Sequence, residues 1–412
     1  MTTAQSEFRT SWPLVVAGAI GCGAGATGLP LYSLGSFVAP LQAEFGWSRA
    51  VVAGAFLPSA LGLAVGGLFI GNIIERWGAR RVVLLSVPIF AAMLALLPVI
   101  VTASAWSFWR ACFFVTFLGI GTSPVAYARV LTTAFDRNLG LALGLTLAGT
   151  GVAAIVLPQL LSPVIAANGW RTGYLVLAAI ALLPWPFAAL MLPKSLERPS
   201  AQPHDKVRRP LFMPSWSHAD ETRRFLLMGA AFFLVSVGML GVIIHLIPML
   251  LDAGIDRDTA ARTAAAVGYG VVGARIMIGW LVDRIHATVI ATLIFLGASL
   301  GCLAIASGNP TMIFVGVIAI GFAVGAEVDL VAYLVSRYFA ARQYARTYGR
   351  QFAIYALGAG LGPLAVSALT SGDGSYVGAL YAASGMILSG AILLLMLGRP
   401  PPTRKDTPLA RA

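Results

Sequence analysis

The sequence is poor in charged and titratable residues. Only 11% of its 412 residues are charged, and it contains four histidines and three cysteines. In their place, 58% of the residues are hydrophobic and the mean hydropathy is +0.85. A soluble domain does not bury that much apolar surface, and a disordered chain would carry more charge. The composition therefore excludes both classes and indicates an integral membrane protein.

The signatures of ATP use and of metal chemistry are also missing. No GxxxxGK[ST] loop, HExxH or CxxC motif occurs in the chain, so neither a P-loop nor a common zinc motif is present. The three cysteines, Cys22, Cys112 and Cys302, lie in apolar stretches without the spacing of metal ligands, which predicts a packing role. We therefore expect no metal, no cofactor and no enzymatic activity, and we expect any transport to be driven by gradients.

Long apolar runs with short polar breaks dominate what remains. A run of about 20 residues crosses a hydrocarbon core of about 30 Å as a helix, and backbone polar groups in lipid must be satisfied within the segment. The sequence predicts twelve such helices, at residues 13–40, 50–74, 82–101, 107–134, 139–166, 171–193, 225–251, 259–282, 287–307, 311–336, 345–371 and 376–398.

One polar stretch interrupts this pattern. Residues 194–224 combine charged residues with Pro199, Pro203, Pro210 and Pro214, which is typical of a linker. The expected fold is therefore all-α and membrane-spanning, with two pseudo-symmetric six-helix bundles. The expected domains are an N-terminal bundle (1–193), a cytoplasmic linker (194–224), a C-terminal bundle (225–398) and a cytoplasmic tail (399–412).

An internal repeat supports the division into two bundles. Residues 71–81 (GNIIERWGARR) and 279–287 (GWLVDRIHA) each follow an apolar run, and 279 minus 71 is 208, about half the chain. Two further pairs match in order: Gly144 with Gly349, and Pro158 with Pro363, each 205 residues apart. Repeats of this length are expected where two similar membrane bundles are joined in tandem.

The net charge of +12 predicts topology rather than nucleic-acid binding. Most of the 28 lysines and arginines fall in loops that would lie on one side of the membrane, together with both termini. Because short cytoplasmic loops are enriched in these residues, both termini should be cytoplasmic. The expected location is the cell membrane, with anionic lipid as the partner of the basic loops and no nucleic acid.

These motifs resemble those of the major facilitator superfamily. Residues 71–81 are similar to its loop 2–3 signature, with Glu75 where Asp is more usual. Residues 45–49 (FGWSR), residues 135–144 (FDRNLGLALG) and Arg275 ahead of Gly279 and Asp283 resemble the monocarboxylate-porter and oxalate–formate antiporter branch. The resemblance implies a transporter that works by alternating access.

The repeated motif is expected to control conformation. Charged residues at helix ends can pair with neighbouring helix ends, and such pairs must break when that side of the transporter opens. The alternative is that the charges only set the topology. The residues expected to form this gate are Gly71, Glu75, Arg76, Gly78, Arg80, Gly279, Asp283 and Arg284.

Charges inside the membrane point to the substrate path. A charged side chain at the bilayer centre costs at least about 2.5–3.5 kcal/mol, so it usually marks a pathway or a pair. Arg275 is the deepest base, and in the resembled branch an arginine at this place contacts the substrate carboxylate. A guanidinium stays protonated and offers a bidentate fork to a carboxylate. The alternative is a structural ion pair of Arg275 with Glu327 or Asp329.

Those two acids are the candidates for proton coupling. Glu327 and Asp329 are two residues apart on one predicted helix and therefore point in different directions. Asp329 shares a face with Tyr333, which predicts an acid–phenol pair. The sequence departs here from the monocarboxylate porters, because residues 12–42 contain no acid and offer Tyr32, Ser33 and Ser36 instead.

Two other residues are candidates with a plain alternative. His245 titrates near neutral pH or donates to an anion, but a lone histidine in an apolar helix is often only a packing residue. Tyr127 is expected to line the central cavity. The expected substrate-binding residues are Arg275, Tyr32, Ser36, Tyr127, His245 and Tyr333.

The sequence thus predicts a monomeric secondary transporter of a small mono- or dicarboxylate, coupled to protons. The alternatives are an anion exchanger, an efflux pump for hydrophobic compounds, and a membrane sensor or receptor on the same fold.

Overall fold

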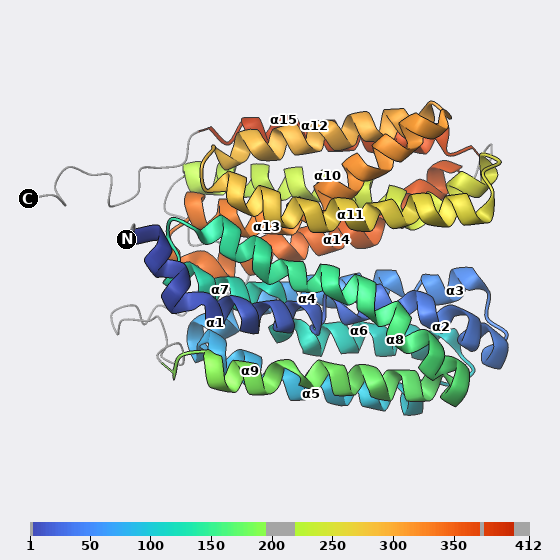
Figure 1. Cartoon of the computed structure of the whole chain (residues 1–412), viewed down its shortest axis with the longest axis horizontal. Helices are drawn as coiled ribbons and strands as arrows, with labels where there is room; N and C mark the ends of the chain where they lie inside the picture. Colours follow the sequence, from blue (N-terminus) through green and yellow to red (C-terminus); the bar gives the residue numbers. More distant parts are fainter. Residues whose placement is uncertain (1–2, 195–218, 371–374, 399–412) are drawn as a thin grey trace, which may run out of the picture.

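The computed structural model describes residues 3–194, 219–370 and 375–398, and these form α-helices with short connections. The helices run roughly parallel to the longest axis of the molecule (Figure 1). The helix α1 begins and α15 ends at the same end of the molecule, on the left of Figure 1. We call this the terminal end, and the other the opposite end.

The first half of the chain packs as one bundle, the N half. Its elements are α1 (Thr3–Gly23), α2 (Leu29–Phe45), α3 (Arg49–Ala53), α4 (Phe56–Trp77), α5 (Ala79–Ile100), α6 (Ala105–Leu118), η1 (Gly119–Thr122), α7 (Pro124–Ala134), α8 (Leu139–Leu182) and α9 (Pro184–Met191).

The second half packs as another bundle, the C half, which lies above the N half in Figure 1. Its elements are α10 (Ala219–Asp252), α11 (Arg257–Val282), α12 (Ala287–Ala306), α13 (Pro310–Tyr338), η3 (Ala341–Gln343), α14 (Tyr344–Thr370) and α15 (Val377–Leu395).

Ten helical segments of the described residues are long and apolar enough to cross a membrane. One of them, Leu139–Met191, holds two crossings, because Gly169 adopts a positive φ of 79° and the chain turns back there. A further crossing consists of α1 and α2, which are separated by a turn. The twelve-helix, two-bundle prediction is therefore confirmed.

Two of the predicted helices are broken near the middle of the molecule. The first breaks between Gly23 and Leu29, where three glycines disfavour continuous helix. The fourth narrows to the 3₁₀ turn η1 ahead of Pro124, whereas the matching helix α13 lacks a proline there and runs unbroken. The two breaks meet, since the backbone N–H of Ala26 donates to Thr122 Oγ1 at 2.9 Å.

The linker between the halves is shorter than predicted at its C-terminal side. Helix α10 begins at Ala219, inside the predicted linker of 194–224, and Asp220 and Glu221 occupy its first turn. Acidic residues favour a helix N-terminus because they interact well with the helix dipole. The rest of the predicted linker and the predicted tail, residues 195–218 and 399–412, lie outside the described residues.

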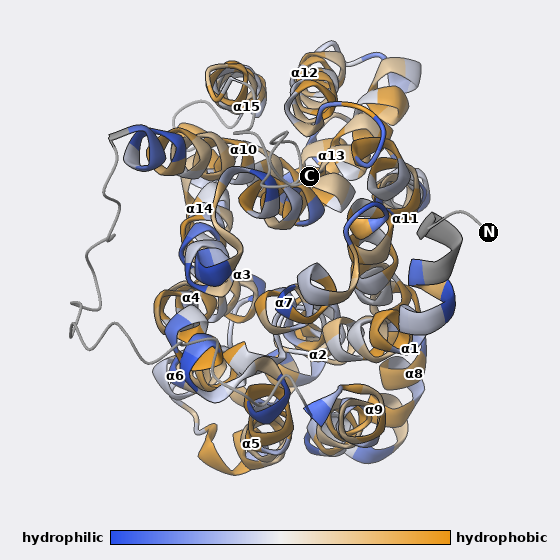
Figure 2. Cartoon of the chain, turned by 90° about the vertical axis from the view of Figure 1, so that its left-hand side faces the viewer, coloured by the Kyte–Doolittle hydropathy of each residue, from blue (hydrophilic) through white to orange (hydrophobic). Residues whose placement is uncertain are grey.

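The outer surface of the bundles is apolar. Large side chains such as Val99, Leu190 and Leu293 are 79%, 85% and 62% exposed. Figure 2, viewed from the terminal end, shows that the outer faces of the helices are coloured mainly as hydrophobic. A monomeric soluble protein rarely exposes so much apolar surface, whereas a lipid bilayer covers it.

The two halves meet along two helix pairs, α4 with α14 and α8 with α11. Both contacts rely on glycine. A Cβ atom on Gly349 of α14 would lie 2.7 Å from the carbonyl oxygen of Gly67 on α4. A Cβ on Gly279 of α11 would lie equally close, 2.7 Å, to the carbonyl oxygen of Gly140 on α8. The glycines therefore let the backbones of the two halves touch, as small residues do between membrane helices.

Candidate functional site

A cavity lies between the two halves, at the middle of the molecule and toward the opposite end. The space between its atoms is about 1230 Å³, including the part that opens to solvent. Its walls come from both halves: the start of α2, α4, α5, α6, the start of α7 and α8 on one side, and α10, α11, α13 and α14 on the other. A cavity of this size holds a ligand of drug-like dimensions or smaller.

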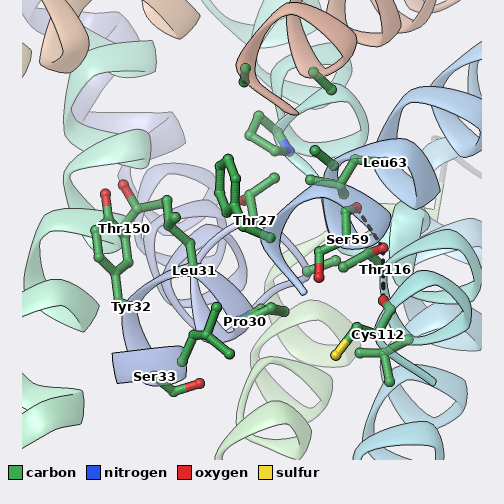
Figure 3. A pocket seen from close by; sticks show the side chains of 18 of the residues that line it. Thr27, Pro30, Leu31, Tyr32, Ser33, Ser59, Leu63, Cys112, Thr116 and Thr150 are labelled. Carbon is green, nitrogen blue, oxygen red and sulfur yellow. Dashed lines mark hydrogen bonds between the residues drawn. The ribbon is translucent and has the colours of Figure 1, made fainter. Parts of the chain in front are cut away.

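The walls of the cavity are mainly apolar. Leu31, Phe56, Leu63, Val324 and Phe352 are typical lining residues. Polar groups are few, and two clusters of them can be followed in Figure 3. Tyr32 and Thr150 lie on one side, and Ser59 and Thr116 lie beside each other on the other, with Cys112 close to them.

Arg275 on α11 is the one charged residue among the described residues that line this cavity. Its side chain is only 6% exposed, and its Nη1 lies 3.2 Å from Oδ1 of Asp329 on α13. Within the described part of the chain, Arg275 Nε and Asp329 Oδ2 have no hydrogen-bond partner. Asp329 thus binds one end of the Arg275 guanidinium, at Nη1, and the Nε–H group is left for another acceptor.

Glu327 lies two residues before Asp329 and takes a different partner. It is fully buried, and its Oε1 accepts the hydroxyl of Tyr355 on α14 at 2.8 Å. Tyr355 itself lines the cavity, whereas neither acid does. Tyr355 therefore connects Glu327 with the cavity, in the same way that Arg275 connects Asp329 with it.

The break between α1 and α2 contributes to the cavity wall. Thr27, Tyr32 and Ser33 all line the cavity there. The Thr27 hydroxyl is buried without a hydrogen-bond partner among the described residues. Broken membrane helices of this kind expose backbone and short polar side chains to a substrate path.

The structure brings together only part of the predicted substrate-binding set. Arg275 and Tyr32 line the cavity, whereas Ser36, Tyr127, His245 and Tyr333 are absent from its wall. Tyr127 is 1% exposed and packs over Gly21 of α1. His245 lies on α10, with its ring nitrogens 3.0 Å from the Gly241 carbonyl oxygen and 3.0 Å from Ser367 Oγ.

The acid–phenol pair predicted for Asp329 and Tyr333 is not formed. Instead, the Tyr333 hydroxyl accepts a hydrogen bond from Arg337 Nη2 at 2.9 Å, and the same nitrogen lies 3.4 Å from the carbonyl oxygen of Asp136 in the N half. The reason is that Arg337 shares the face of Tyr333 one turn further on and is a stronger donor. The acid–phenol pair of this helix is that of Glu327 with Tyr355.

Two matched carboxylates join the halves at the terminal end. Glu75, at the end of α4, forms an ion pair with Arg346, in which Oε2 and Nη2 are 2.7 Å apart. Its Oε1 also accepts the backbone N–H of Arg346 at 3.3 Å, at the start of α14. The predicted gate acid thus caps a helix N-terminus of the other half.

Asp283 makes the equivalent contact on the other helix pair. Its two carboxylate oxygens accept the backbone N–H groups of Gly140 and Leu141, at 2.8 and 3.0 Å, where α8 begins. Burial raises the pKa of the Asp283 carboxyl, and the hydrogen bonds from Leu141 and Gly140 oppose that rise. The repeat seen in the sequence is therefore also a repeat of contacts, with each half capping the other.

The remaining residues of the gate motif have mainly local contacts, and Gly71 is the exception. Gly78 joins α4 to α5 with a φ of 83°, which favours glycine. Arg80 Nη2 donates to the Ala189 carbonyl at 2.9 Å, and Arg284 lies 3.9 Å above the ring of Trp280. Gly71 packs against the backbone of Ala345 and Arg346, while Arg76 is exposed. Gly71 therefore takes part in the contact between the halves together with Glu75 and Asp283, whereas Gly78 and the three arginines shape the loop or lie on its surface.

The Glu75 contact leads to a testable expectation. Glu75→Gln keeps the shape of the side chain but removes the charge that holds Arg346, a pair worth about 1 kcal/mol at this partial exposure. The ratio of open to closed molecules at the terminal end should therefore rise about fivefold. Spin labels at the exposed positions 137 and 342, one in each half, would report this as a longer distance in double electron–electron resonance.

Glu44→Gln is the matched control. Glu44 pairs with Arg171 at 2.6 Å, but both residues belong to the N half and lie at the opposite end. The same change of charge there should leave the distance between labels 137 and 342 as in the unaltered protein. Unchanged distances in Glu75→Gln would mean that this ion pair does not control the gate.

Several residues of the cavity escaped the sequence analysis. Thr27, Ser59, Thr116 and Tyr355 have no charge and stand in segments rich in similar residues, so no pattern singles them out. Cys112, interpreted from the sequence as a packing residue, lines the cavity and is a natural reporter of its occupancy. Their common feature is a position on the face between the two halves. Such a position can be recognised only when the packing of all the helices is known.

The pattern of the Major Facilitator Superfamily matches residues 20–306 and 226–412. The chain is 29% identical over 366 residues to human monocarboxylate transporter 11, covering 84% of this chain and 75% of that one. It is 28% identical over 383 residues to the 3-(3-hydroxy-phenyl)propionate transporter of Escherichia coli K12, covering 90% and 91%. It is 26% identical over 389 residues to the cis,cis-muconate transport protein of Acinetobacter baylyi, covering 89% of each.

Solved structures agree with this assignment at the level of the fold. The human organic anion transporter MFSD10 superposes with a TM-score of 0.71 at 17% identity, covering 94% of this chain and 99% of that one. The fucose:proton symporter of E. coli superposes with a TM-score of 0.71 at 15% identity, covering 96% and 100%.

Proposed function

The chain belongs to the major facilitator superfamily, and we propose that it transports a small organic anion with one carboxylate and an apolar or aromatic body. Members of this family are membrane transporters and not enzymes, so transport across a membrane is the activity of this chain. The substrate, the driving ion and the direction are the parts that we propose.

The observation that carries the proposal is the guanidinium of Arg275, the one charged group among the described residues that line the apolar cavity. A carboxylate is the common biological group that matches the planar fork of arginine, and a low-dielectric wall strengthens the interaction. With Arg275 as the one cation on the described wall, the cavity suits a single carboxylate better than two. The leucine, valine and phenylalanine side chains would contact the rest of the substrate.

The relatives support this substrate class. Proteins similar over most of the chain are named for the transport of monocarboxylates, of 3-(3-hydroxy-phenyl)propionate and of cis,cis-muconate. The first two carry one carboxylate, and the second has an aromatic ring that would suit Phe56 and Phe352. Muconate has two carboxylates, so a dicarboxylate is the alternative within this class.

We place the terminal end in the cytoplasm of a cell, with the chain in the cell membrane. Basic residues gather at that end, including Arg76, Arg81, Arg137 and Arg342, as expected for cytoplasmic loops. With the Glu75 and Asp283 contacts intact, the two halves are closed on that side, and the cavity would face the outside. Alternating access would require these contacts to break as the halves rock.

We further propose that transport is coupled to protons through Asp329. This carboxylate occupies Arg275 Nη1, so it competes with a substrate carboxylate for the same guanidinium. A proton on Asp329 would weaken that pair and free Arg275 for the substrate. Exchange of one anion for another is the alternative, in which Asp329 remains ionised throughout.

The apolar walls also suit an efflux pump for hydrophobic compounds, and uptake measurements separate the two functions. Protein in proteoliposomes should take up radiolabelled 3-(3-hydroxyphenyl)propionate but not its uncharged amide, which has almost the same shape. Equal transport of acid and amide would favour the efflux pump. Binding of the acid without transport of any anion would favour a sensor or receptor.

A further inference from the structure

A layer of buried polar groups lies between the cavity and the terminal end, and neither the cavity nor the gate accounts for it. Each of its members sits about one helical turn to the terminal side of a residue that lines the cavity. The three lining residues are Pro124 on α7, Thr150 on α8 and Phe352 on α14. Tyr127 follows Pro124 by three residues, Thr146 precedes Thr150 by four, and Tyr348 precedes Phe352 by four.

The hydroxyls of this layer are unsatisfied. Tyr348, Tyr127 and Thr146 are 0%, 1% and 2% exposed, and their hydroxyl oxygens have no hydrogen-bond partner among the described residues. Within a membrane, a polar group without a partner is costly, so such groups usually serve a pathway or find a partner in another state. Three of them in one layer, contributed by both halves, point to a ligand that is bound there in another conformation.

The surroundings of Tyr348 give the layer its chemistry. Its ring lies 6.3 Å from that of Phe352, and the Phe352 ring lies 5.8 Å from that of Tyr355, which makes a continuous aromatic face from the cavity floor toward the terminal end. Phe352 and Tyr355 line the cavity together with Arg275, so this aromatic face leads from the Arg275 site to Tyr348. Hydroxyl donors suit an anion, and an aromatic face suits an apolar body.

We propose that the hydroxyls of Tyr348, Tyr127 and Thr146 form a second carboxylate station, which takes the substrate over from Arg275 when the terminal end opens. This inference rests on the proposed carboxylate transport. The two halves part at this layer when the terminal end opens, which exposes the hydroxyls to the central path. The substrate then exchanges the guanidinium for hydroxyl donors and leaves Arg275 free to pair with Asp329 again.

Removal of a single hydroxyl tests the station. Tyr348→Phe should reduce the turnover of carboxylate uptake about tenfold or more, because the substrate loses its donor on the way out. Binding in the cavity should stay within twofold of the unaltered protein, measured as the substrate concentration that protects Cys112 from a maleimide. Cys22 and Cys302 are 0% exposed and provide little background. The thermal midpoint should stay equal or rise, because an unpaired buried hydroxyl has been removed.

Tyr344→Phe is the matched control on the same helix. The Tyr344 ring is 5.7 Å from that of Tyr348, but its hydroxyl donates to the Ala332 carbonyl at 3.3 Å. This variant should lose some thermal stability and keep its turnover within twofold. Tyr127→Phe serves as the second test of the station from the other half, and it should lower turnover in the same way as Tyr348→Phe.

The outcomes separate this inference from the function on which it rests. If the unaltered protein takes up no carboxylate, the proposed function fails. If it does, but Tyr348→Phe and Tyr127→Phe both turn over at its rate, the second station does not exist. A loss of cavity binding as large as the loss of turnover would also overturn it, since the hydroxyls would then act at the Arg275 site.

Discussion

Replacing Arg275 by lysine should lower carboxylate uptake about a hundredfold, which corresponds to about 2.7 kcal/mol of transition-state stabilisation. Lysine retains the charge and can still pair with Asp329, so the protein should fold. The ammonium is a point charge, however, and it cannot hold Asp329 and offer a bidentate fork to the substrate in the way that a guanidinium does. Initial rates of uptake into proteoliposomes measure the effect.

The control for this substitution is Arg110→Lys. Arg110 is exposed on α6, and its Nε donates to the Trp106 carbonyl within its own helix at 3.3 Å. The same change there should leave uptake unaffected. Because Arg275→Ala would leave Asp329 buried without its partner, Arg275→Ala with Asp329→Asn is the better test of complete loss. Carboxylate transport at the original rate in both Arg275→Lys and this double variant would show that Arg275 is not the anchor.

The second large effect is expected at Asp329. Asp329→Asn should abolish the accumulation of substrate driven by a pH gradient, because asparagine can neither bind nor release the coupling proton. Exchange of labelled for unlabelled substrate should continue, since exchange does not require the return of an empty, deprotonated carrier. The two modes are measured in the same proteoliposomes, with and without an imposed pH gradient.

Glu327→Gln is the comparison for this variant. Glu327 accepts the Tyr355 hydroxyl and lies off the Arg275 pair, so glutamine can keep the hydrogen bond through its carbonyl oxygen. We expect accumulation to survive better in Glu327→Gln than in Asp329→Asn. If both variants still accumulate substrate when a proton gradient alone is applied, α13 is structural and the coupling proposal is wrong. Asp329 is favoured because it competes with the substrate for Arg275, since the Tyr333 hydroxyl is bound to Arg337 instead.

The amino-acid sequence by itself determined the membrane class, the helices and the division into two halves. Helix formation in lipid depends on local hydropathy and on hydrogen bonds within one segment, and these are readable along the chain. The repeat of Gly71 and Glu75 in Gly279 and Asp283 was readable for a related reason, because two similar bundles joined in tandem have matching residues at a nearly constant offset. The depth of Arg275 also followed from its distance to the next loop.

Contacts between helices could not be obtained in this way. The repeat identifies Glu75 and Asp283, but it does not show that each carboxylate caps a helix of the other half, at Arg346 and at Gly140. Neighbouring residues of one helix point in different directions around its axis. Which of these directions faces the cavity is set by all the neighbouring helices together. For that reason Tyr355 reaches Glu327 and Tyr333 turns to Arg337, while Tyr127 and Tyr348 lie below the cavity floor. Only the packing of the twelve helices decided which hydroxyls and carboxylates share the path between the halves.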